Sequence, residues 1–427
     1  MKPKKVHFIF AGGAAVSAVA ALAEKNGFEV SACEHLNPDS PFFGELLKLK
    51  IPTFKECSKE HLQDVEMLVV SNATKKIDPE NSEVEEAERL KLPVKIAEEF
   101  LAEFLLQDKK VVAVAGTNGK STTTAMLGLI LEKARLDPSV FVGAVVPDWQ
   151  SNYRAGKGEI FVIEADEYSE KFLLYRPQVE IITNIEFDHP DYFTSLEAVQ
   201  SAFEDFAAQV ASDGALFLGP KVELRNQKEK QKTFVKENFN LRVPGQFNQE
   251  NASLAFAAAL YLGVGSEIAK QALEVFDGIS RRFEFRGEAK GIKVFDDYAH
   301  HPSGVAVTLK AAREKFPNEK IWCVFQPHTF SRLEKLFPQF VEAFEKAPVD
   351  NIVLLPVYAS RERAGKFVSD DLARAIKNKE VVSTGSKEQA AVYLAKNVDF
   401  GSVILNLGAG DSNELSELIL KKVGNKA

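Results

Sequence analysis

One short loop constrains the fold of this chain more than any other segment. Residues 113–127 read AVAGTNGKSTTTAML, so an apolar, strand-like run meets a glycine turn and then a helix-forming stretch. The P-loop pattern G-x-x-x-x-G-K-[ST] requires a glycine at position 114, where this chain has Val114, and the glycine comes at Gly116 instead. Because the strand, the turn and the helix are all present, the pattern indicates a shorter phosphate loop rather than a broken one.

The residue types of this loop suit a nucleoside triphosphate. Gly116 and Gly119 let the backbone wrap closely around an anion, and the first N–H groups of the following helix point at the same spot. Lys120 can reach terminal phosphates, and a hydroxyl of Ser121 or Thr122 can ligate Mg²⁺. The alternative is an ordinary strand–helix connection with a surface lysine. We expect ATP and Mg²⁺ as the ligands of this loop.

Two later strands end in residues that can bind metal ions. Glu164 directly follows the apolar run Ile160–Ile163, and His189 follows the segment TNIEFD. Acids at the carboxyl ends of central strands are typical of active sites in doubly wound sheets. We expect Glu164 to hold Mg²⁺ and His189 to serve a second metal ion or a phosphoryl group. Asp166 and Glu167, just beyond Glu164, are consistent with solvent-facing acids.

Composition narrows the class of protein. The chain has 427 residues and a net charge of −8, which predicts about three domains and argues against a nucleic-acid-binding protein. The three cysteines, Cys33, Cys57 and Cys323, are widely spaced, as in proteins of reducing compartments. No apolar run reaches the ~20 residues of a membrane span. We expect a cytoplasmic protein without nucleic-acid or membrane partners, and its oligomeric state is left open.

The N-terminal segment has two interpretations. Its basic start, apolar run and A-V-A site resemble a secretory signal. It is equally a strand at Val6–Phe10, a turn at Ala11–Ala14, a helix at Val16–Lys25 and a second strand that ends at Glu34. An acid about 20 residues past the glycines is typical of nucleotide-binding folds. We favour this second interpretation, because a secreted protein would meet no ATP.

Short β-rich runs alternate with helical ones along the rest of the chain. This βαβ rhythm predicts an α/β protein with largely parallel sheets. We expect a Rossmann-like N-terminal domain at 1–106, a P-loop-type ATP-binding domain at 107–287 and a Rossmann-like C-terminal domain at 288–427. Helices are expected at Glu83–Leu90 and Ala97–Leu106.

Eight segments form a specific set: GTNGKSTTTAML, IEADEYSEKFL, TNIEFDHPDYF, PGQFNQENASLAFAAA, FDGISRRFEFRGE, DDYAHHPSGVAVTLKAAR, FQPHTFSR and GAGD. Together they make the chain resemble the Mur ligase family over nearly its whole length. The resemblance implies an ATP-dependent amide ligase of peptidoglycan precursor synthesis. Within the family it is strongest to the branch that joins L-alanine to the lactyl carboxylate of UDP-N-acetylmuramate. That branch lacks the carbamylated lysine of several Mur ligases, and this chain has no lysine between Phe172 and Pro220.

The resemblance also implies roles for single residues. The metal ligands would be Ser121, Glu164 and His189. The ATP contacts would be Gly116, Thr117, Asn118, Gly119, Lys120, Ser121, Thr122, Asn248, Asn251, Arg282 and Asp297. The UDP-N-acetylmuramate and alanine contacts would be Gly12, Gly13, Ser17, Glu34, Tyr298, His300, His328 and Arg332. The catalytic set would be Lys120, Glu164, His189, His300, His328 and Arg332.

The chemistry follows from the poor leaving group of a carboxylate. Phosphorylation by ATP makes an acyl phosphate, which an amine can then attack. We expect Arg332 to bind the carboxylate of alanine bidentately. For His300 and His328 we expect hydrogen-bond donation to a carboxylate, with the role of a base as the alternative. Closure of the third domain is expected to assemble the site.

The first-domain loop departs from the family pattern. The family has G-x-G-G-x-G-M-S where this chain has FAGGAAVS, so Phe10 and Ala15 replace two glycines and Phe10 is expected to crowd a diphosphate. Binding of the uridine nucleotide is therefore less certain than binding of ATP. Three alternatives stay open: a tripeptide ligase of peptidoglycan recycling, a folylpolyglutamate-type ligase, and a nucleotide-binding homologue without catalysis.

Overall fold

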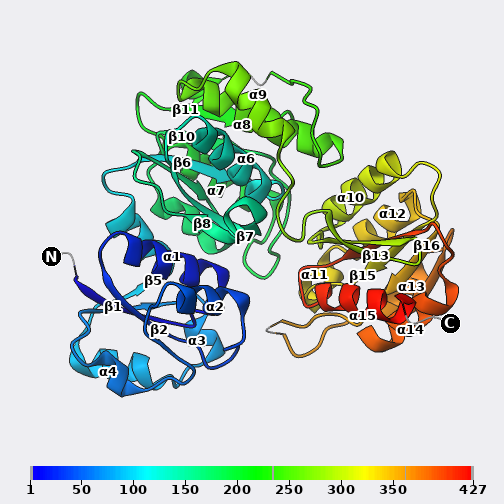
Figure 1. Ribbon diagram of the computed structural model, residues 1–427, viewed down its shortest axis with the longest axis horizontal. Coiled ribbons are helices and arrows are strands. Elements are labelled where there is room, and N and C mark those ends of the chain that lie inside the picture. Colours follow the sequence, from blue (N-terminus) through cyan, green and yellow to red (C-terminus); the bar gives the residue numbers. More distant parts are fainter. Residues whose placement is uncertain (1–2, 233–234, 361, 425–427) are drawn as a thin grey trace.

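The computed structural model describes residues 3–232, 235–360 and 362–424. These residues form three α/β units, each built on its own sheet (Figure 1). The N-terminal unit (blue) and the central unit (green) lie one against the other, and the C-terminal unit (yellow to red) lies beside them. The predicted α/β class with three units is confirmed.

The N-terminal sheet is parallel throughout, in the order β3-β2-β1-β4-β5. Its strands are β1 (Lys5–Ile9), β2 (Glu29–Cys33), β3 (Thr53–Phe54), β4 (Met67–Val70) and β5 (Val94–Ile96). Its helices are α1 (Ala14–Lys25), α2 (Pro41–Lys48), η1 (Lys59–Leu62), α3 (Thr74–Ile77), α4 (Ser82–Leu90) and α5 (Ala97–Phe100). The predicted strand–turn–helix–strand unit is present, but β1 ends one residue early, because Phe10 takes the left-handed φ of +58° that opens the turn.

The central sheet places the glycine loop at its middle. The order is β12-β11-β10-β6-β9-β7-β8, and only the β7–β8 pair is antiparallel. The strands are β6 (Lys110–Ala115), β7 (Ser139–Val146), β8 (Ser151–Arg154), β9 (Ile160–Glu164), β10 (Val179–Ile182), β11 (Ala215–Leu218) and β12 (Gln231–Lys232). The helices are α6 (Lys120–Lys133), α7 (Leu196–Ala207), α8 (Gln246–Tyr261) and α9 (Ser266–Glu274). Since β6, β9 and β10 are parallel neighbours, their carboxyl ends meet at one edge.

The C-terminal sheet has the order β13-β14-β18-β15-β16-β17, and only the β13–β14 pair is antiparallel. The strands are β13 (Glu284–Ala289), β14 (Ile292–Asp297), β15 (Ile321–Phe325), β16 (Asn351–Leu354), β17 (Glu380–Ser383) and β18 (Val403–Leu407). The helices are α10 (Pro302–Lys315), α11 (Phe330–Lys335), α12 (Phe337–Lys346), α13 (Ser369–Ala375), α14 (Lys387–Asn397) and α15 (Asn413–Gly424).

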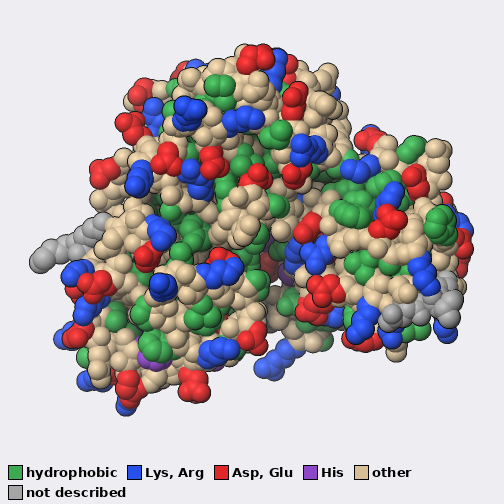
Figure 2. All heavy atoms as spheres, in the orientation of Figure 1, with side chains coloured by type: hydrophobic (Ala, Val, Ile, Leu, Met, Phe, Trp, Pro, Cys, Tyr) green, Lys and Arg blue, Asp and Glu red, His purple; other side chains and the backbone are tan. Residues whose placement is uncertain are grey.

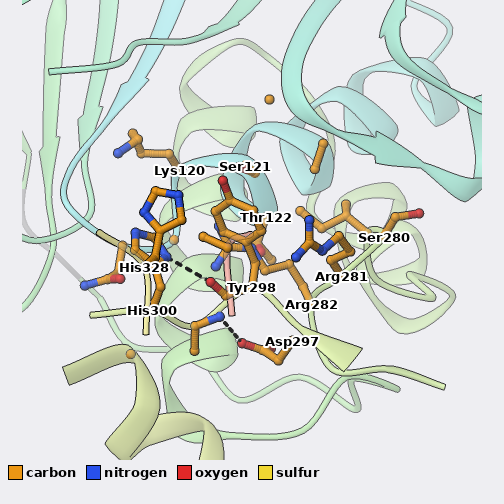
Figure 3. Close-up of a pocket in the computed structure, with 18 of the residues that line it drawn as sticks. Lys120, Ser121, Thr122, Ser280, Arg281, Arg282, Asp297, Tyr298, His300 and His328 are labelled. Atoms are coloured by element: carbon orange, nitrogen blue, oxygen red, sulfur yellow. Dashed lines mark hydrogen bonds between the residues drawn. The ribbon is translucent and has the colours of Figure 1, made fainter. Parts of the chain in front are cut away.

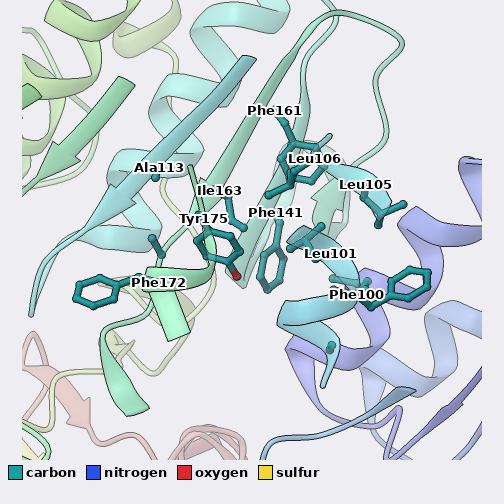
Figure 4. Close-up of a cluster of buried hydrophobic side chains, with 14 of the residues drawn as sticks. Phe100, Leu101, Leu105, Leu106, Ala113, Phe141, Phe161, Ile163, Phe172 and Tyr175 are labelled. Atoms are coloured by element: carbon teal, nitrogen blue, oxygen red, sulfur yellow. The ribbon is translucent and has the colours of Figure 1, made fainter. Parts of the chain in front are cut away.

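The N-terminal and central units share one continuous apolar core (Figure 4). The helix predicted at Ala97–Leu106 is α-helical only to Phe100, and Leu101–Leu105 forms a wider π-type turn. Side chains of this turn pack in the same cluster as Phe141 and Tyr175 of the central unit. The correction reflects tertiary packing, which overrides a local preference for α-helix. In the described part of the chain, no helix is long and apolar enough to cross a membrane.

Candidate active site

A cavity of about 920 Å³ opens where the three units meet. The molecule is visibly hollowed between the N-terminal and C-terminal units (Figure 2), and side chains from the central and C-terminal units gather around the pocket (Figure 3). The predicted residues that line it are Thr117, Asn118, Gly119, Lys120, Ser121, Thr122, Glu164, His189, Asn248, Asn251, Arg282, Asp297, Tyr298, His300, His328 and Arg332. The fold thus brings together side chains that lie more than two hundred positions apart in the sequence.

The short glycine loop has a backbone that only glycine fits. Gly116 has φ +129°, and a Cβ there would lie 2.1 Å from Thr183 Oγ1. Gly119 has φ +90°, and a Cβ there would lie 2.5 Å from Asn251 Oδ1. The N–H of Asn118 donates to Asn184 Oδ1 at 2.9 Å. Thr183 and Asn184 after β10, together with Asn251 on α8, therefore clamp the loop and leave no room for a side chain at either glycine.

Lys120 folds back over this loop and pairs with a buried acid. Its Nζ donates to Glu167 Oε2 at 2.8 Å and to the carbonyl of Gly116 at 2.7 Å. Burial alone would lower the pKa of Lys120, but Glu167 and two neighbouring carboxylates outweigh it and raise that pKa. The expectation that Glu167 faces solvent is wrong, since its side chain is only 2% exposed. The acid is buried because it holds the lysine.

The oxygen donors expected for Mg²⁺ lie side by side. Ser121 Oγ donates to Glu164 Oε1 at 2.9 Å, and the other oxygen of Glu164 accepts from the N–H of Gly143. Hydroxyl and carboxylate oxygens are the ligands that Mg²⁺ prefers, so this pair fits the ion. A second group, Asp166, Glu167 and His189, has ligand atoms within 4.8 Å of one another.

An ion pair joins the central and C-terminal units at the pocket. Arg332 Nε and Nη2 donate to Asp188 Oδ1 at 3.0 and 2.9 Å, and both side chains are about 6% exposed. Burial alone would raise the pKa of Asp188, but Arg332 holds it well below its usual range. One edge of the Arg332 guanidinium is therefore already taken. Its expected bidentate contact with an alanine carboxylate is left to the other edge, formed by Nη1 and Nη2.

Further contacts fix the same junction. The side chain of Asn118 donates to Ser303 Oγ at 3.3 Å, and His301 Nε2 lies 3.1 Å from the carbonyl oxygen of Phe187. Ser303 also donates to Glu186. In this structure the C-terminal unit thus touches both the glycine loop and the segment that carries His189.

His300 and His328 present opposite hydrogen-bonding faces. His300 Nδ1 lies 2.9 Å from the carbonyl of Tyr298, which can only accept, so Nδ1 carries the proton and Nε2 is an acceptor. His328 Nδ1 lies 3.2 Å from Arg332 Nη1, which can only donate, so its Nε2 carries the proton. Burial lowers the pKa of His300 well below its usual range and that of His328 to about 4. The expected donor role therefore suits His328, whereas His300 suits a base.

On the side of the pocket expected to hold the nucleoside, polar side chains form hydrogen bonds with the protein backbone. Asn248 donates to the carbonyl of Pro244 at 2.7 Å. Asp297 is buried and accepts from the N–H groups of Phe283 and Ala299, each at 2.8 Å, and burial raises its pKa. The guanidinium carbon of Arg282 lies 5.1 Å from the ring centre of Tyr298. Asp297 thus shapes the loop that presents Arg282 and Tyr298 to the pocket.

The predicted first-domain residues lie outside the pocket. Glu34 is buried, and its Oε2 accepts from the N–H of Gly12 at 2.8 Å while its Oε1 accepts from Leu36 at 2.9 Å. A Cβ on Gly12 would lie 2.6 Å from that Oε2, so the carboxylate fills the concavity above the glycine. Ser17 donates to a backbone carbonyl of its own helix. Phe10, expected to crowd a diphosphate, instead packs in a small core beneath the sheet.

The N-terminal unit reaches the pocket through other residues: Ala14, Pro41, Phe42 and Lys76. Sequence reasoning missed these residues, together with Glu167 and Asp188. The pattern EADE contains Glu167, but nothing local distinguishes the buried acid from the exposed ones. Gly116, although predicted, lies outside the residues that line the pocket and contributes its carbonyl to Lys120.

Comparison with known proteins now gives the family. Three family models match: the Mur ligase family catalytic domain at residues 5–109, the Mur ligase middle domain at 114–237 and the Mur ligase glutamate ligase domain at 281–410. The UDP-N-acetylmuramate–L-alanine ligase of Alkaliphilus metalliredigens is 33% identical, over 98% of this chain and 97% of that protein. This chain belongs to the Mur ligase family. It is therefore an ATP-dependent ligase of the kind that acts on peptidoglycan precursors.

Solved structures agree with this fold. The UDP-N-acetylmuramate-alanine ligase of Thermotoga maritima is 29% identical, covers 98% of both chains and superposes with a TM-score of 0.79. A murein peptide ligase of Psychrobacter arcticus covers 99% of both chains with a TM-score of 0.69, and at 23% identity that likeness shows the fold alone.

Proposed function

We propose that this Mur ligase joins L-alanine to the lactyl carboxylate of UDP-N-acetylmuramate and consumes ATP. One observation supports it above the others: a single cavity is lined by the Lys120 loop, by the His300–His328–Arg332 group and by residues of the N-terminal unit. The 33% identity to an alanine ligase over nearly the whole chain supports the same substrates. A cytoplasmic location belongs to this proposal, because the nucleotide substrates are made there.

In the first step Lys120 and the loop N–H groups stabilise charge on the transferring phosphoryl group. Lys120 is placed for this by Glu167, which acts as a positioning residue. The lactyl carboxylate is already a nucleophile, so no protein base is needed here. When bound, Mg²⁺ would neutralise phosphate charge, held by Ser121 and Glu164. His189, beside Asp166 and Glu167, would hold a second ion.

In the second step the ammonium group of alanine must lose a proton before it attacks. The free Nε2 of His300 is an acceptor for this proton. Burial lowers the pKa of His300, so the ring is neutral before the step but acts as a weak base that must pass the proton on. The Nε2–H of His328 can donate to a carboxylate. Arg332 would meet the same carboxylate through its Nη1–Nη2 edge. We therefore assign proton acceptance to His300 and carboxylate binding to His328 and Arg332.

Product analysis tests the proposed amino acid. The purified protein is incubated with ATP, Mg²⁺ and UDP-N-acetylmuramate, and with L-alanine, glycine, L-serine or the tripeptide L-alanyl-γ-D-glutamyl-meso-diaminopimelate. Mass spectrometry of the nucleotide product is expected to show addition of one alanine. A product with the tripeptide and none with alanine would instead establish the recycling ligase.

A further inference from the structure

A group of histidine, cysteine and glutamate side chains, residue types that can ligate metal ions, lies inside the N-terminal unit. The chain has seven histidines and three cysteines, and three of these histidines and two of these cysteines gather here. They are His7, Cys33, His35, Cys57 and His61. Of these, His7, Cys33 and His61 contact the carboxylate of Glu83, while Cys57 lies against Cys33 and His35 against Cys57. Among the described residues that line the active-site pocket, none belongs to this group.

Adjacent elements of the fold create the group. His7 on β1 and Cys33 on β2 belong to neighbouring parallel strands, and α4 supplies Glu83 from its first turn. All three side chains are fully buried, at 0% exposure. His7 Nε2 lies 3.2 Å from Glu83 Oε1, and Cys33 Sγ lies 2.9 Å from Glu83 Oε2. The ligand atoms of the three residues lie within 4.8 Å of one another.

One nitrogen of the group is buried without a hydrogen bond. His7 Nε2 makes none, although Glu83 is close to it. The other ring nitrogen, Nδ1, lies 2.7 Å from Ser31 Oγ, so the ring is oriented with Nε2 toward the carboxylate. The contact of Nε2 with Glu83 Oε1 at 3.2 Å lacks good hydrogen-bond geometry, so this buried nitrogen and the carboxylate are placed to share a ligand. Metal-binding histidines are typically oriented in this way by a second hydrogen bond.

We propose that His7, Cys33 and Glu83 bind a divalent transition-metal ion of the zinc class, with Cys57 as a fourth ligand. Cys57 lies on the partly exposed loop between β3 and η1, and its Sγ is 3.1 Å from Cys33 Sγ. Ligand atoms around tetrahedral Zn²⁺ stand roughly 3.3–3.8 Å apart, given bonds of ~2.0–2.3 Å. The three observed separations of 2.9–3.2 Å need to widen by only a few tenths of an ångström. Cys57 must in addition move inward with its loop, because among the described residues of this group only His7, Cys33 and Glu83 have ligand atoms that all lie within 4.8 Å of one another.

The donor set also selects the metal. Thiolate and imidazole suit Zn²⁺ and Co²⁺, whereas Mg²⁺ requires oxygen ligands, so the ATP metal does not compete here. Only a thiolate binds the ion, so binding releases the thiol proton of each cysteine to solvent. Such an ion would join β1, β2, α4 and the Cys57 loop. The expected effect is stabilisation of the N-terminal unit, with no part in the transfer of phosphate.

Cobalt binding tests this site without using the ligase reaction. The full-length protein is stripped with a chelator, kept reduced with a phosphine, and titrated with Co²⁺ in a large excess of Mg²⁺. We expect one equivalent to bind, with the near-ultraviolet charge-transfer band of cobalt–thiolate bonds, and Zn²⁺ to displace it. Cys323→Ser is the matched control, because Cys323 is a buried free cysteine in the C-terminal unit.

Two variants locate the site. Cys33→Ser is expected to abolish the band, and Cys57→Ser, on the partly exposed loop, to reduce it by about half and weaken binding at least ~10-fold. Circular dichroism shows whether each variant folds. If Cys33→Ser does not fold, Cys57→Ser alone tests the location of the metal site. Absence of the band in the wild type would overturn the site. Equal binding by wild type and Cys57→Ser would overturn the role of Cys57.

Discussion

Removal of Lys120 is predicted to destabilise the central unit as well as to stop the reaction. The ammonium group pairs at 2.8 Å with Glu167, and the two side chains are 13% and 2% exposed. Glu167 Oε1 makes no hydrogen bond and lies 3.7 Å from His189 Nε2, so Lys120→Met removes the one side chain that donates a hydrogen bond to this buried carboxylate in the described structure. Breaking a buried pair in this way costs about 3–5 kcal/mol of unfolding free energy while the remaining group stays charged. Burial raises the pKa of Glu167 and so favours its protonation, and we expect a cost near the lower end of that range.

Replacement of Glu167 instead of Lys120 is predicted to lower the unfolding free energy by a smaller amount. In Glu167→Gln the ammonium keeps two backbone acceptors, the carbonyls of Gly116 and Thr117 at 2.7 and 3.4 Å. We expect a loss of about 1–3 kcal/mol, the usual range for a buried group that loses one of several partners. The double variant, which buries no unpaired charge, should be more stable than Lys120→Met alone. The two changes should therefore be non-additive by at least ~1.5 kcal/mol.

Urea unfolding monitored by tryptophan fluorescence measures the unfolding free energy of the central unit. The chain has two tryptophans, and a Trp322→Phe background leaves Trp149, which packs on the central core. Asp277→Asn is the control, because its pair with Arg242 is 61% and 55% exposed and should change stability by at most ~0.5 kcal/mol. A cost below about 1 kcal/mol for Lys120→Met, or strict additivity, would refute the reasoning.

Three further predictions concern the loop, the interdomain pair and a histidine. Gly116→Ala should abolish ATP binding in calorimetry, since its Cβ would lie 2.1 Å from a side chain. Gly44→Ala is the control: it lies inside a helix with open space around it, so this variant should bind ATP normally and be more stable by about 0.5–1 kcal/mol. Burial raises the pKa of Asp188, but Arg332 lowers it, and the net pKa is depressed. The ion pair therefore stabilises docking of the C-terminal unit at and above the ordinary pKa of aspartate, and this stabilisation is lost only when the pH falls below that value. X-ray scattering should therefore show a docked C-terminal unit in the wild type at pH 5 and a looser one in Asp188→Asn, and identical profiles would contradict this. Burial lowers the pKa of His328 to about 4, so the ring should stay neutral from pH 8 to about 5 and should not change the ligase rate over that range. A fall in the rate near pH 6.5 that is absent in His328→Asn would contradict this.

The parts of the site that the sequence predicted are those formed within one βα unit. Loop, strand and helix around Gly116 are contiguous, and parallel strands bring Glu164 and His189 to the same edge without further information. Contacts between distant segments were not predictable in this way. Arg332 and Asp188 are 144 positions apart, and their pairing depends on how two units dock. The burial of Glu167 likewise depends on where Lys120 points.

The first-domain loop shows the same limit from the other direction. Its glycines and Glu34 matched a nucleotide-binding pattern, yet the carboxylate of Glu34 itself accepts the N–H of Gly12. A local sequence pattern predicts a backbone that can bind an anion, but it does not predict whether that anion is a ligand or a side chain of the protein. Binding of UDP-N-acetylmuramate, the substrate that we propose, tests whether a diphosphate displaces Glu34 from the N–H of Gly12.

Phosphate release tests the central claim most directly. The purified protein is assayed with ATP, Mg²⁺ and UDP-N-acetylmuramate, with and without L-alanine, beside the Lys120→Ala variant. We predict release that depends on both alanine and the uridine nucleotide and that is lost in the variant. Release that does not change when alanine is added, or that persists in Lys120→Ala, would contradict the account.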